Sequence, residues 1–243
     1  MKISYIILTH NRLETLIYHV QSIRLQDYLC DKLEVIVADD GSTDGTREYC
    51  EKSKFVDVYV NTENVDKATP ARARNMGMEK ATGELMVFAD DDCLPHPLLL
   101  QEYQKTDRGF CSVGYRSSLK NRLAFQLIIF NPDGDLEAGR PQEYYKRAVN
   151  NAFIWHHFSS GSFAILKEDL KGIRFDEEFE GYGYEDRYFA KQLANQGIKF
   201  EFLYRAIIYH DHAANQQEPK KKEEERIKNK EMFLKKLNEK QGD

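Results

Sequence analysis

One stretch of this chain decides its fold, an apolar run that ends in three acids: Leu85-Met86-Val87-Phe88-Ala89-Asp90-Asp91-Asp92. An apolar run of this length is typical of a strand that is buried inside a sheet. Three adjacent carboxylates at the end of such a strand repel one another unless a cation lies among them. The hard ions Mg²⁺ and Mn²⁺ prefer oxygen ligands and often bridge to substrate phosphates. The other interpretation is an acidic turn that caps a helix, although a cap requires one acid and not three.

Strand and helix signals alternate on either side of this stretch. The apolar runs predict strands at residues 3–8, 33–38, 55–60 and 85–89, and helical spacing predicts helices at 13–23 and 71–81. Strands separated by helices indicate βαβ units and a mostly parallel sheet. Ligands of such sheets bind beyond the carboxyl ends of the strands. We therefore expect Thr9, Asp40 and Asp90, each at or just after the end of a strand, to line one crevice.

The second half of the chain is less regular. Strands are predicted at 110–115, 161–166 and 200–209, and a helix is predicted at 184–196, before Gly197. A chain of 243 residues suits one α/β domain, with or without a tail. The residues from 220 to 240 are dense in charge, which indicates a solvated terminal helix or an amphipathic helix on a membrane or a partner subunit.

Composition excludes several classes of protein. The net charge of −5 argues against a general nucleic-acid surface. No run approaches the roughly 18 apolar residues of a membrane span, and the apolar start is interpreted as a first strand and not a signal peptide. The four cysteines are scattered without CxxC spacing, so neither a zinc site nor a disulfide framework is expected. A cytoplasmic protein, with possible peripheral membrane contact, fits best.

Two further clusters point to a phosphorylated ligand. The carboxylate of Asp40 can accept hydrogen bonds from a base or a ribose, or can belong to a capped loop, and both roles are compatible. Arg72 and Arg74 lie near a predicted helix start, where cations oppose the macrodipole. This conflict suggests an anionic partner, whereas the alternative is a solvated basic face. Because no glycine-rich phosphate loop is present, metal and arginine are expected to bind any phosphates.

Asp186 carries the strongest sign of catalysis. Glycines and tyrosines alternate just before it, and the helical spacing places it on one apolar stripe with Phe189, Ala190 and Leu193. A carboxylate on such a stripe is costly unless it has a partner or a task. A general base at a helix start beside a pliable loop could reach an incoming hydroxyl. The alternative is that Asp186 or Glu185 pairs with Arg187 or caps the helix.

Histidines and a tryptophan offer weaker signals. His210 and His212 follow a strand-like run, and an HxH pair is a weak signal, so at most one of them is expected to bind a metal. Imidazole suits Mn²⁺, and His210 is the preferred ligand, with His212 as the alternative. Trp155 lines an acceptor pocket or fills the core.

Several segments together resemble the successive motifs of family 2 glycosyltransferases, which have the GT-A fold. They are IILTHNR at 6–12, VADDGSTDGT at 37–46, ARNMG at 73–77 and FADDD at 88–92. GSFAI at 161–165 and GYGYED at 181–186 resemble the C-terminal block of galactosyltransferase-type enzymes, which usually reads Trp-Gly-Gly-Glu-Asp. Tyrosines replace the tryptophan and one glycine of that block.

The resemblance implies a GT-A fold, in which a Rossmann-like, mostly parallel central sheet is flanked by helices. A smaller acceptor-side region and a C-terminal helix complete the expected architecture. The expected domain covers residues 1–217, with a nucleotide-sugar-binding half at 1–115 and an acceptor-binding half at 116–217. Residues 218–243 are then the charged helix or tail.

Matching residues to the motifs implies roles for individual side chains, a divalent Mn²⁺ or Mg²⁺, and a nucleotide-diphosphate sugar that is usually a UDP-sugar. Asp186 matches the catalytic base and Glu185 the neighbour that binds the acceptor. Asp92 and His210 are the expected metal ligands. The donor-binding residues are expected to be Thr9, Asn11, Asp40, Arg72, Arg74, Asn75, Asp90 and Asp91. The acceptor side is expected to include Trp155, Gly161, Tyr182 and Tyr184.

The predicted reaction is an inverting, metal-dependent transfer of a sugar to a hydroxyl of a glycan or glycoconjugate. One alternative is a sugar nucleotidyltransferase, which usually needs a phosphate loop after the first strand, and this chain has none there. Another alternative is a non-catalytic module that binds nucleotide sugars or glycans, against which the placement of Asp186 on an apolar stripe argues. A homo-oligomer formed through the C-terminal helix is a further possibility for partners.

Overall fold

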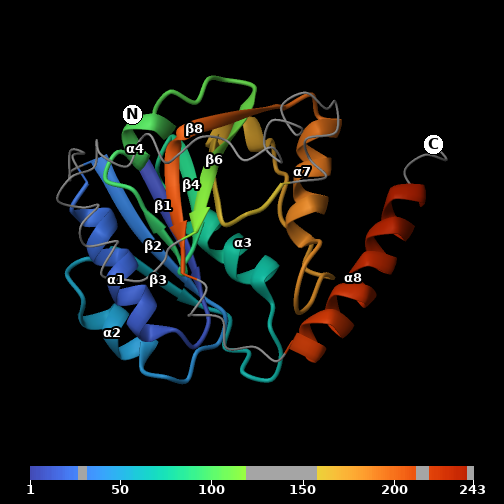
Figure 1. The fold of residues 1–243 in the computed structure, drawn as a ribbon, viewed down its shortest axis with the longest axis horizontal. Coiled ribbons are helices and arrows are strands. Elements are labelled where there is room, and N and C mark those ends of the chain that lie inside the picture. Colours follow the sequence, from blue (N-terminus) through green and yellow to red (C-terminus); the bar gives the residue numbers. More distant parts are fainter. Residues whose placement is uncertain (27–31, 119–157, 212–218, 240–243) are drawn as a thin grey trace.

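The computed structural model describes residues 1–26, 32–118, 158–211 and 219–239. Within these ranges, eight strands form one sheet in the order β3-β2-β1-β4-β7-β6-β8-β5 (Figure 1). Helices lie on both faces of the sheet, which confirms the predicted α/β class. The strands are β1 (Ile3–Thr9), β2 (Leu33–Asp39), β3 (Val58–Asn61), β4 (Leu85–Asp90), β5 (Cys93–Pro95), β6 (Phe110–Ser118), β7 (Ser162–Leu166) and β8 (Lys199–His210).

The half of the sheet that carries the acid-rich strand ends is parallel, as the sequence predicts. β1 pairs with β2 and with β4 in parallel, and β2 pairs with β3 in the same way. The register aligns Thr9 with Asp39 and Leu8 with Asp90. Because parallel strands end at the same edge of a sheet, the side chains that follow β1, β2 and β4 meet there.

The other half of the sheet is mixed. β7 is antiparallel to both β4 and β6, while β8 runs parallel to β6 and antiparallel to β5. β5 has three residues and the helix α4 (Leu99–Tyr103) has five, so neither has the length over which a periodic pattern can be detected. The third strand begins at Val58 and not at residue 55, because Ser53 and Val56 form a turn.

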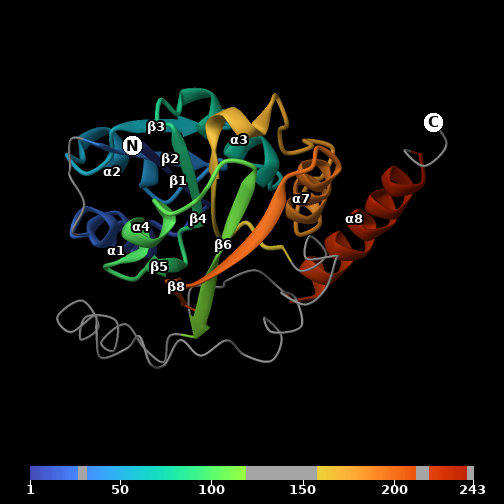
Figure 2. The ribbon, with the colours of Figure 1, turned by 90° about the horizontal axis from the view of Figure 1, so that it is seen from above.

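Alternate side chains of the strands pack against helices on opposite faces. Ile6 belongs to a core with α3 (Pro70–Lys80) and α7 (Glu185–Asn195). Tyr5 and Ile7 belong to a second core with α1 (Leu13–Arg24), α2 (Thr46–Lys52) and α4. Figures 1 and 2 show the sheet between these two groups of helices. A short 3₁₀ helix at Lys167–Leu170 follows β7.

A glycine sets the distance between α3 and the sheet. A Cβ at Gly77 would lie 2.7 Å from Cγ2 of Ile6 and 3.5 Å from Cβ of Ala38. The contact with Ile6 is shorter than the packing of carbon atoms allows, whereas the distance to Ala38 is an ordinary van der Waals contact. Gly77 therefore permits α3 to lie directly on β1 and β2, which positions Arg74, one turn earlier on the helix.

The charged C-terminal segment forms α8 (Pro219–Glu239). It lies next to α7, on the side of the molecule remote from α1 and α2, in both views (Figures 1 and 2). Phe233 is 5% exposed, and its ring lies 5.3 Å from that of Tyr184 and 6.4 Å from that of Tyr188. None of the helices in the described ranges has both the length and the apolar character needed to cross a membrane.

Candidate active site

A cleft of about 730 Å³ opens at the carboxyl edge of the parallel strands. The ends of β1 and β4 form its floor, and the loop at residues 65–70 forms part of its wall. The start of α7 and the first turns of α8 form the remainder, so segments far apart in the sequence meet here. Its charged lining includes the acids of β4, the acids of α7, and the cations Arg12, Lys67, Arg187, Lys221, Lys222 and Arg226.

Asp90, Asp91 and Asp92 form a turn at the end of β4, which we call the acid turn. Asp91 is its buried centre. One of its carboxylate oxygens accepts a hydrogen bond from Oγ1 of Thr9 at 2.7 Å, and the other accepts one from Arg12 at 2.9 Å. Its carbonyl oxygen lies 3.1 Å from Nδ1 of His19, whose Nε2 is 2.9 Å from the Tyr5 hydroxyl. Burial raises the pKa of Asp91 to about 7, and the opposing effect of Arg12 is smaller. Asp91 therefore fixes the turn on which its two neighbours stand.

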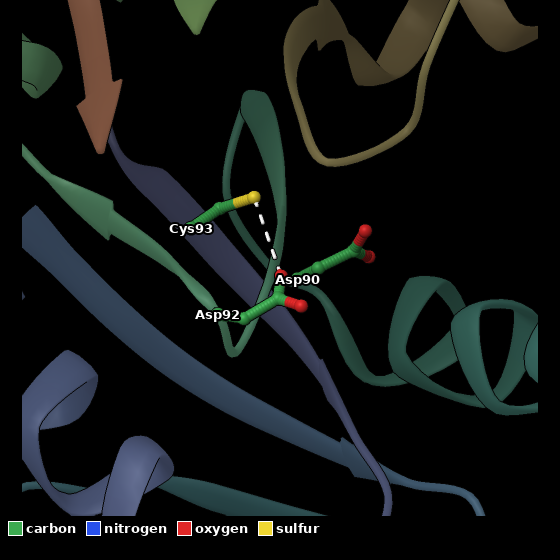
Figure 3. A group of neighbouring side chains, drawn as sticks. All are labelled: Asp90, Asp92 and Cys93. Atoms are coloured by element: carbon green, nitrogen blue, oxygen red, sulfur yellow. Dashed lines mark hydrogen bonds between the residues drawn. The ribbon is translucent and has the colours of Figure 1, made fainter. Parts of the chain in front are cut away.

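Asp92 points into the cleft. Its Oδ2 lies 2.7 Å from the Arg12 guanidinium and 3.7 Å from Nε2 of His210. Ligand atoms of Asp90, Asp92 and Cys93 all lie within 4.8 Å of one another. Figure 3 shows the Cys93 thiol next to Asp92, while the Asp90 carboxylate extends away from this pair.

The chemistry of this cluster suits a hard divalent cation. Carboxylate oxygens and an imidazole are donors that Mn²⁺ accepts, and Mg²⁺ favours the carboxylates. Burial raises the pKa of the Cys93 thiol well above its usual value, so that group stays protonated at neutral pH. Because a thiol must be deprotonated to bind a metal, we assign no ligand role to Cys93.

Arg74 connects the two sides of the cleft. The side chain is 3% exposed, and its guanidinium donates to Asp90 at 2.9 Å and to Glu185 at 3.2 Å. The same group lies 5.4 Å from the centre of the Phe175 ring. One buried cation thus balances an acid at the end of β4 and an acid at the start of α7.

The two acids that the resemblance assigns to catalysis and acceptor binding, Glu185 and Asp186, lie at the first two positions of α7. Glu185 is buried, and among the described residues no hydrogen-bond partner reaches its Oε2. Asp186 is partly buried and lines the cleft. Burial, followed by the negative charge of Glu185, raises the pKa of Asp186 to about 7. A carboxyl with a pKa near neutrality can remove a proton in this pH range.

The residues that are expected to border a nucleoside lie where β1 and β2 end. Asp40 lines the cleft, and its carboxylate accepts hydrogen bonds from Thr62 and from the backbone and hydroxyl of Thr69. Burial raises the pKa of Asp40. Asn11 has a positive φ of 51°, and its Oδ1 accepts a hydrogen bond from the Thr43 amide. Both residues therefore line the cleft while stabilising the loops that form it.

Three expected site residues do not line this cleft. Arg72 is exposed, because it lies two positions from Arg74 and thus on the far side of α3. Asn75 is buried and exchanges hydrogen bonds with the backbone of Phe175. Gly161 lies behind the acid turn, where a Cβ would be 3.2 Å from Oδ2 of Asp90.

The two tyrosines that are expected on the acceptor side differ in their exposure. Tyr182 is 47% exposed and lines the cleft, with Nζ of Lys222 5.0 Å from the centre of its ring. Tyr184 is buried between the cleft and α8. Trp155 and His212 lie outside the described residues.

Sequence reasoning assigned no role to Arg12, His19 or the lysines at the start of α8. Arg12 is the last residue of the first motif, so its position there could have predicted that it lies in the cleft. His19 is a single histidine on an amphipathic helix and gave no signal of its contact with the acid turn. The cations Lys221 and Lys222 belong to a mixed-charge run, from which their position in the cleft could not be read.

The motifs at these strand ends are those of a known family. A profile described as "Glycosyl transferase family 2" matches residues 4–171. The chain therefore belongs to glycosyl transferase family 2. The matched region ends before residues 181–186, so the resemblance of that segment to the galactosyltransferase-type block stays a prediction.

Individual relatives agree with this assignment. The chain is 30% identical over 188 residues to a GalNAc(5)-diNAcBac-PP-undecaprenol beta-1,3-glucosyltransferase of Campylobacter jejuni, covering 74% of this chain and 56% of that protein. It spans 36% to 62% of the length of the first four curated relatives.

Solved structures share the fold. S. aureus TarS 1-349 in complex with UDP-GlcNAc superposes with a TM-score of 0.66 at 21% identity, covering 93% of this chain and 64% of that one. The mannosyltransferase PcManGT of Pyrobaculum calidifontis in complex with GDP-Man and Mn²⁺ gives a TM-score of 0.57 at 24% identity, covering 86% and 56%. These matches confirm the predicted GT-A fold.

Proposed function

We propose that this protein is an inverting, metal-dependent glycosyltransferase that moves a sugar from a nucleotide-diphosphate donor to a hydroxyl of a glycan or glycoconjugate. The observation that carries the proposal is one cleft in which the acids at the end of β4 face the acids at the start of α7. Membership of family 2 favours transfer over a nucleotidyltransferase or a non-catalytic binding module.

The donor is proposed to be a UDP-sugar that lies over the ends of β1, β2 and β4. Thr9, Asn11 and Asp40 would border the nucleoside, and Asp90 the ribose or the metal. A relative in fold binds UDP-GlcNAc and another binds GDP-Man, which supports a nucleotide sugar and leaves the base and the sugar to experiment.

Asp92 and His210 would bind a Mn²⁺ or Mg²⁺ ion, and their atoms face each other in the cleft. When bound, such an ion neutralises the charge that develops on a leaving diphosphate. Arg12 contacts Asp91 and Asp92 and orients the acid turn. A solved relative contains Mn²⁺, which supports this choice of ion.

The chemical step is assigned to Asp186. Its carboxylate removes the proton from an acceptor hydroxyl while that oxygen attacks the anomeric carbon of the donor. The new carbon–oxygen bond forms opposite the bond to the diphosphate, which breaks and releases the nucleoside diphosphate. Glu185 would accept a hydrogen bond from the acceptor through its Oε2, which has no hydrogen-bond partner among the described residues. Base catalysis of this kind contributes roughly 10²–10⁴-fold.

The test separates donor binding from chemistry. A thermal-shift screen of UDP-sugars and GDP-mannose with and without MnCl₂ should identify a donor, because a ligand of the folded state raises its stability. Asp92→Asn should remove the metal-dependent part of the shift. Asp186→Asn should keep that shift and lower the rate of transfer at least 100-fold.

Asp107→Asn, which changes an exposed aspartate outside the cleft, is the matched control. Near-normal turnover by Asp186→Asn would disprove the base assignment.

Peripheral contact with a membrane through α8 and assembly into a homo-oligomer stay predictions. The exposed Ile227 and Leu234 of α8 are candidate contact residues. Sedimentation of the full chain with anionic liposomes, with Leu234→Ser as the variant, tests the first of these predictions.

A further inference from the structure

The helix α8 contacts the segment that leads into the proposed catalytic acids. Nζ of Lys236 lies 2.8 Å from Asp176 and 2.9 Å from Glu178. One turn earlier, Phe233 packs against Tyr184 and Tyr188 of the loop and α7. The helix therefore contacts this segment at several positions between residues 176 and 188.

Asn229 makes the central contact. Its side chain is fully buried, and Nδ2 lies 2.9 Å from the carbonyl oxygen of Glu180, 3.3 Å from that of Tyr182 and 2.9 Å from that of Gly183. An amide group has two hydrogens, so these are shared among three carbonyl oxygens of one short loop. The amide of Tyr182 in turn donates to Glu225 of α8 at 3.0 Å.

The loop that α8 contacts has an unusual backbone. Gly181, Gly183 and Tyr184 have φ values of 74°, 89° and 73°. The left-handed region is disfavoured for a residue such as tyrosine, so surrounding contacts must stabilise it there. A Cβ at Gly181 would lie 2.6 Å from Cδ of Glu225, which shows how closely the loop and the helix approach.

This loop determines where α7 begins. Tyr184 is the N-cap residue of α7, and Glu185 and Asp186 are the first two residues of that helix. A rotation of the 182–184 backbone would move both carboxylates relative to the acid turn of β4. The carbonyl groups that Asn229 contacts are thus two to six residues from the two acids.

We propose that Asn229 is a positioning residue: by its hydrogen bonds to the carbonyl groups of residues 180, 182 and 183, it fixes the start of α7 and the orientation of Glu185 and Asp186. The proposal rests on the proposed function, since it assigns a purpose to the geometry of those acids. It makes α8 part of the active site, and not a solvated tail.

Asn229→Asp in the full chain is the sharpest test. The substitution keeps the shape of the side chain and replaces the donor group with an acceptor that faces three carbonyl oxygens. The matched control is Asn238→Asp, the same chemical change at an exposed position of the same helix. Asn229→Ala is the second variant and removes the contact without adding a charge.

The rate of UDP release from UDP-glucose, UDP-N-acetylglucosamine and UDP-N-acetylgalactosamine is measured for each protein. Small misplacements of reacting groups can lower rates by roughly 100-fold. We expect a loss of that size for both Asn229 variants, an altered pH dependence of the remaining rate, and an unchanged thermal shift with UDP and MnCl₂. The control should match the parent. Equal rates in the parent and both Asn229 variants would overturn the proposal.

Hydrogen exchange separates this proposal from the proposed function. The amides of residues 181–188 should exchange at least tenfold faster in Asn229→Ala, while those of β1 and β4 stay unchanged. A parent protein that releases no UDP from any of these three donors would contradict the proposed UDP-sugar donor, and the exchange result would then decide alone whether Asn229 fixes the loop. Unchanged exchange at 181–188 would overturn that role in either case.

Discussion

Arg74 shows how one residue joins chemistry to structure. Its sequence position near a helix start suggested a cation for a bound anion. In the structure its guanidinium lies between Asp90 and Glu185, so the anions it contacts belong to the protein. Removing one member of such a buried pair leaves an uncompensated charge, which typically destabilises a protein by about 3–5 kcal/mol. Arg74 therefore keeps two acids close together that would otherwise repel each other.

Asp186 should give the protein a characteristic dependence on pH. Its pKa is raised to about 7 by burial and by Glu185, so the ionised base forms as the pH rises through 7. We expect the rate of transfer to increase about tenfold per pH unit below 7 and to level off above it. The measurement is a profile of kcat/KM from pH 5 to pH 9.

The free energy of unfolding should fall as the pH rises, whereas the rate of transfer increases. Between pH 4 and pH 7 the folded protein retains a proton on Asp186 that the unfolded chain has lost, so its contribution to the free energy of unfolding falls as the pH rises. Asp186→Asn removes this effect. Since one pKa unit corresponds to about 1.4 kcal/mol, the variant should be more stable than the parent by on the order of 2–4 kcal/mol at pH 8.

The comparison with Asp186→Asn is required because Asp91 also has a pKa of about 7. Its titration is common to both proteins and cancels in the difference between their denaturation curves. A difference in stability that stays constant from pH 4 to pH 8 would contradict the assignment of the raised pKa to Asp186.

The sequence predicted that Thr9, Asp40 and Asp90 line one cleft whose position follows from strand geometry. They converge because parallel strands end at one edge. The contact of Arg12 with Asp92 spans 80 residues, and that of Asn229 with Gly183 spans 46. Contacts of that range depend on the packing of whole helices, and no local pattern in the sequence encodes them.

At the level of elements, continuous apolar runs made β1, β2 and β4 predictable to within one residue. The antiparallel insertion of β7 between β4 and β6 was not predicted, because strand order depends on pairing between distant segments. β5 and α4 were missed because they are too short to show a period. The long β8 was predicted as an extended segment, although its partners were not.

Gly77 provides a test of packing between α3 and the sheet. Alanine is favoured over glycine in a helix by up to about 1 kcal/mol, so Gly77→Ala at an open position would stabilise the protein. Here the added Cβ would meet Cγ2 of the buried Ile6 at 2.7 Å. We expect a net destabilisation of about 1–3 kcal/mol, measured by chemical denaturation.

A second substitution identifies the cause. Ile6→Ala removes the atom that the new Cβ would meet, so the two changes together should cost less than the sum of their separate effects. Additive effects in this double-mutant cycle would show that the contact with Ile6 is not the source of the destabilisation.

At the level of the whole molecule, α8 is attached to the rest of the chain by a small apolar contact and a few polar ones. Phe233→Ala should lower the free energy of unfolding by about 3 kcal/mol, because the buried ring contacts Tyr184 and Tyr188. The neighbouring Leu234 is 49% exposed, so Leu234→Ala should change stability by less than about 0.5 kcal/mol.

Urea denaturation of the three proteins checks this prediction. The rate of sugar transfer, measured in parallel, should fall for Phe233→Ala and stay near that of the parent for Leu234→Ala. Equal losses of stability in both variants would mean that α8 does not pack against α7 through Phe233.

β4 lies between β1 and β7 in the sheet, and this arrangement limits what can be exchanged between related proteins. Residues 1–115 grafted alone onto another protein would present β4 as an open strand edge, to which other chains could add. Arg74 would keep its ion pair with Asp90 but lose its ion pair with Glu185. A chimaera designed to swap donor specificity must therefore also carry β7 and α7, the segments that close the edge and supply the counter-ion.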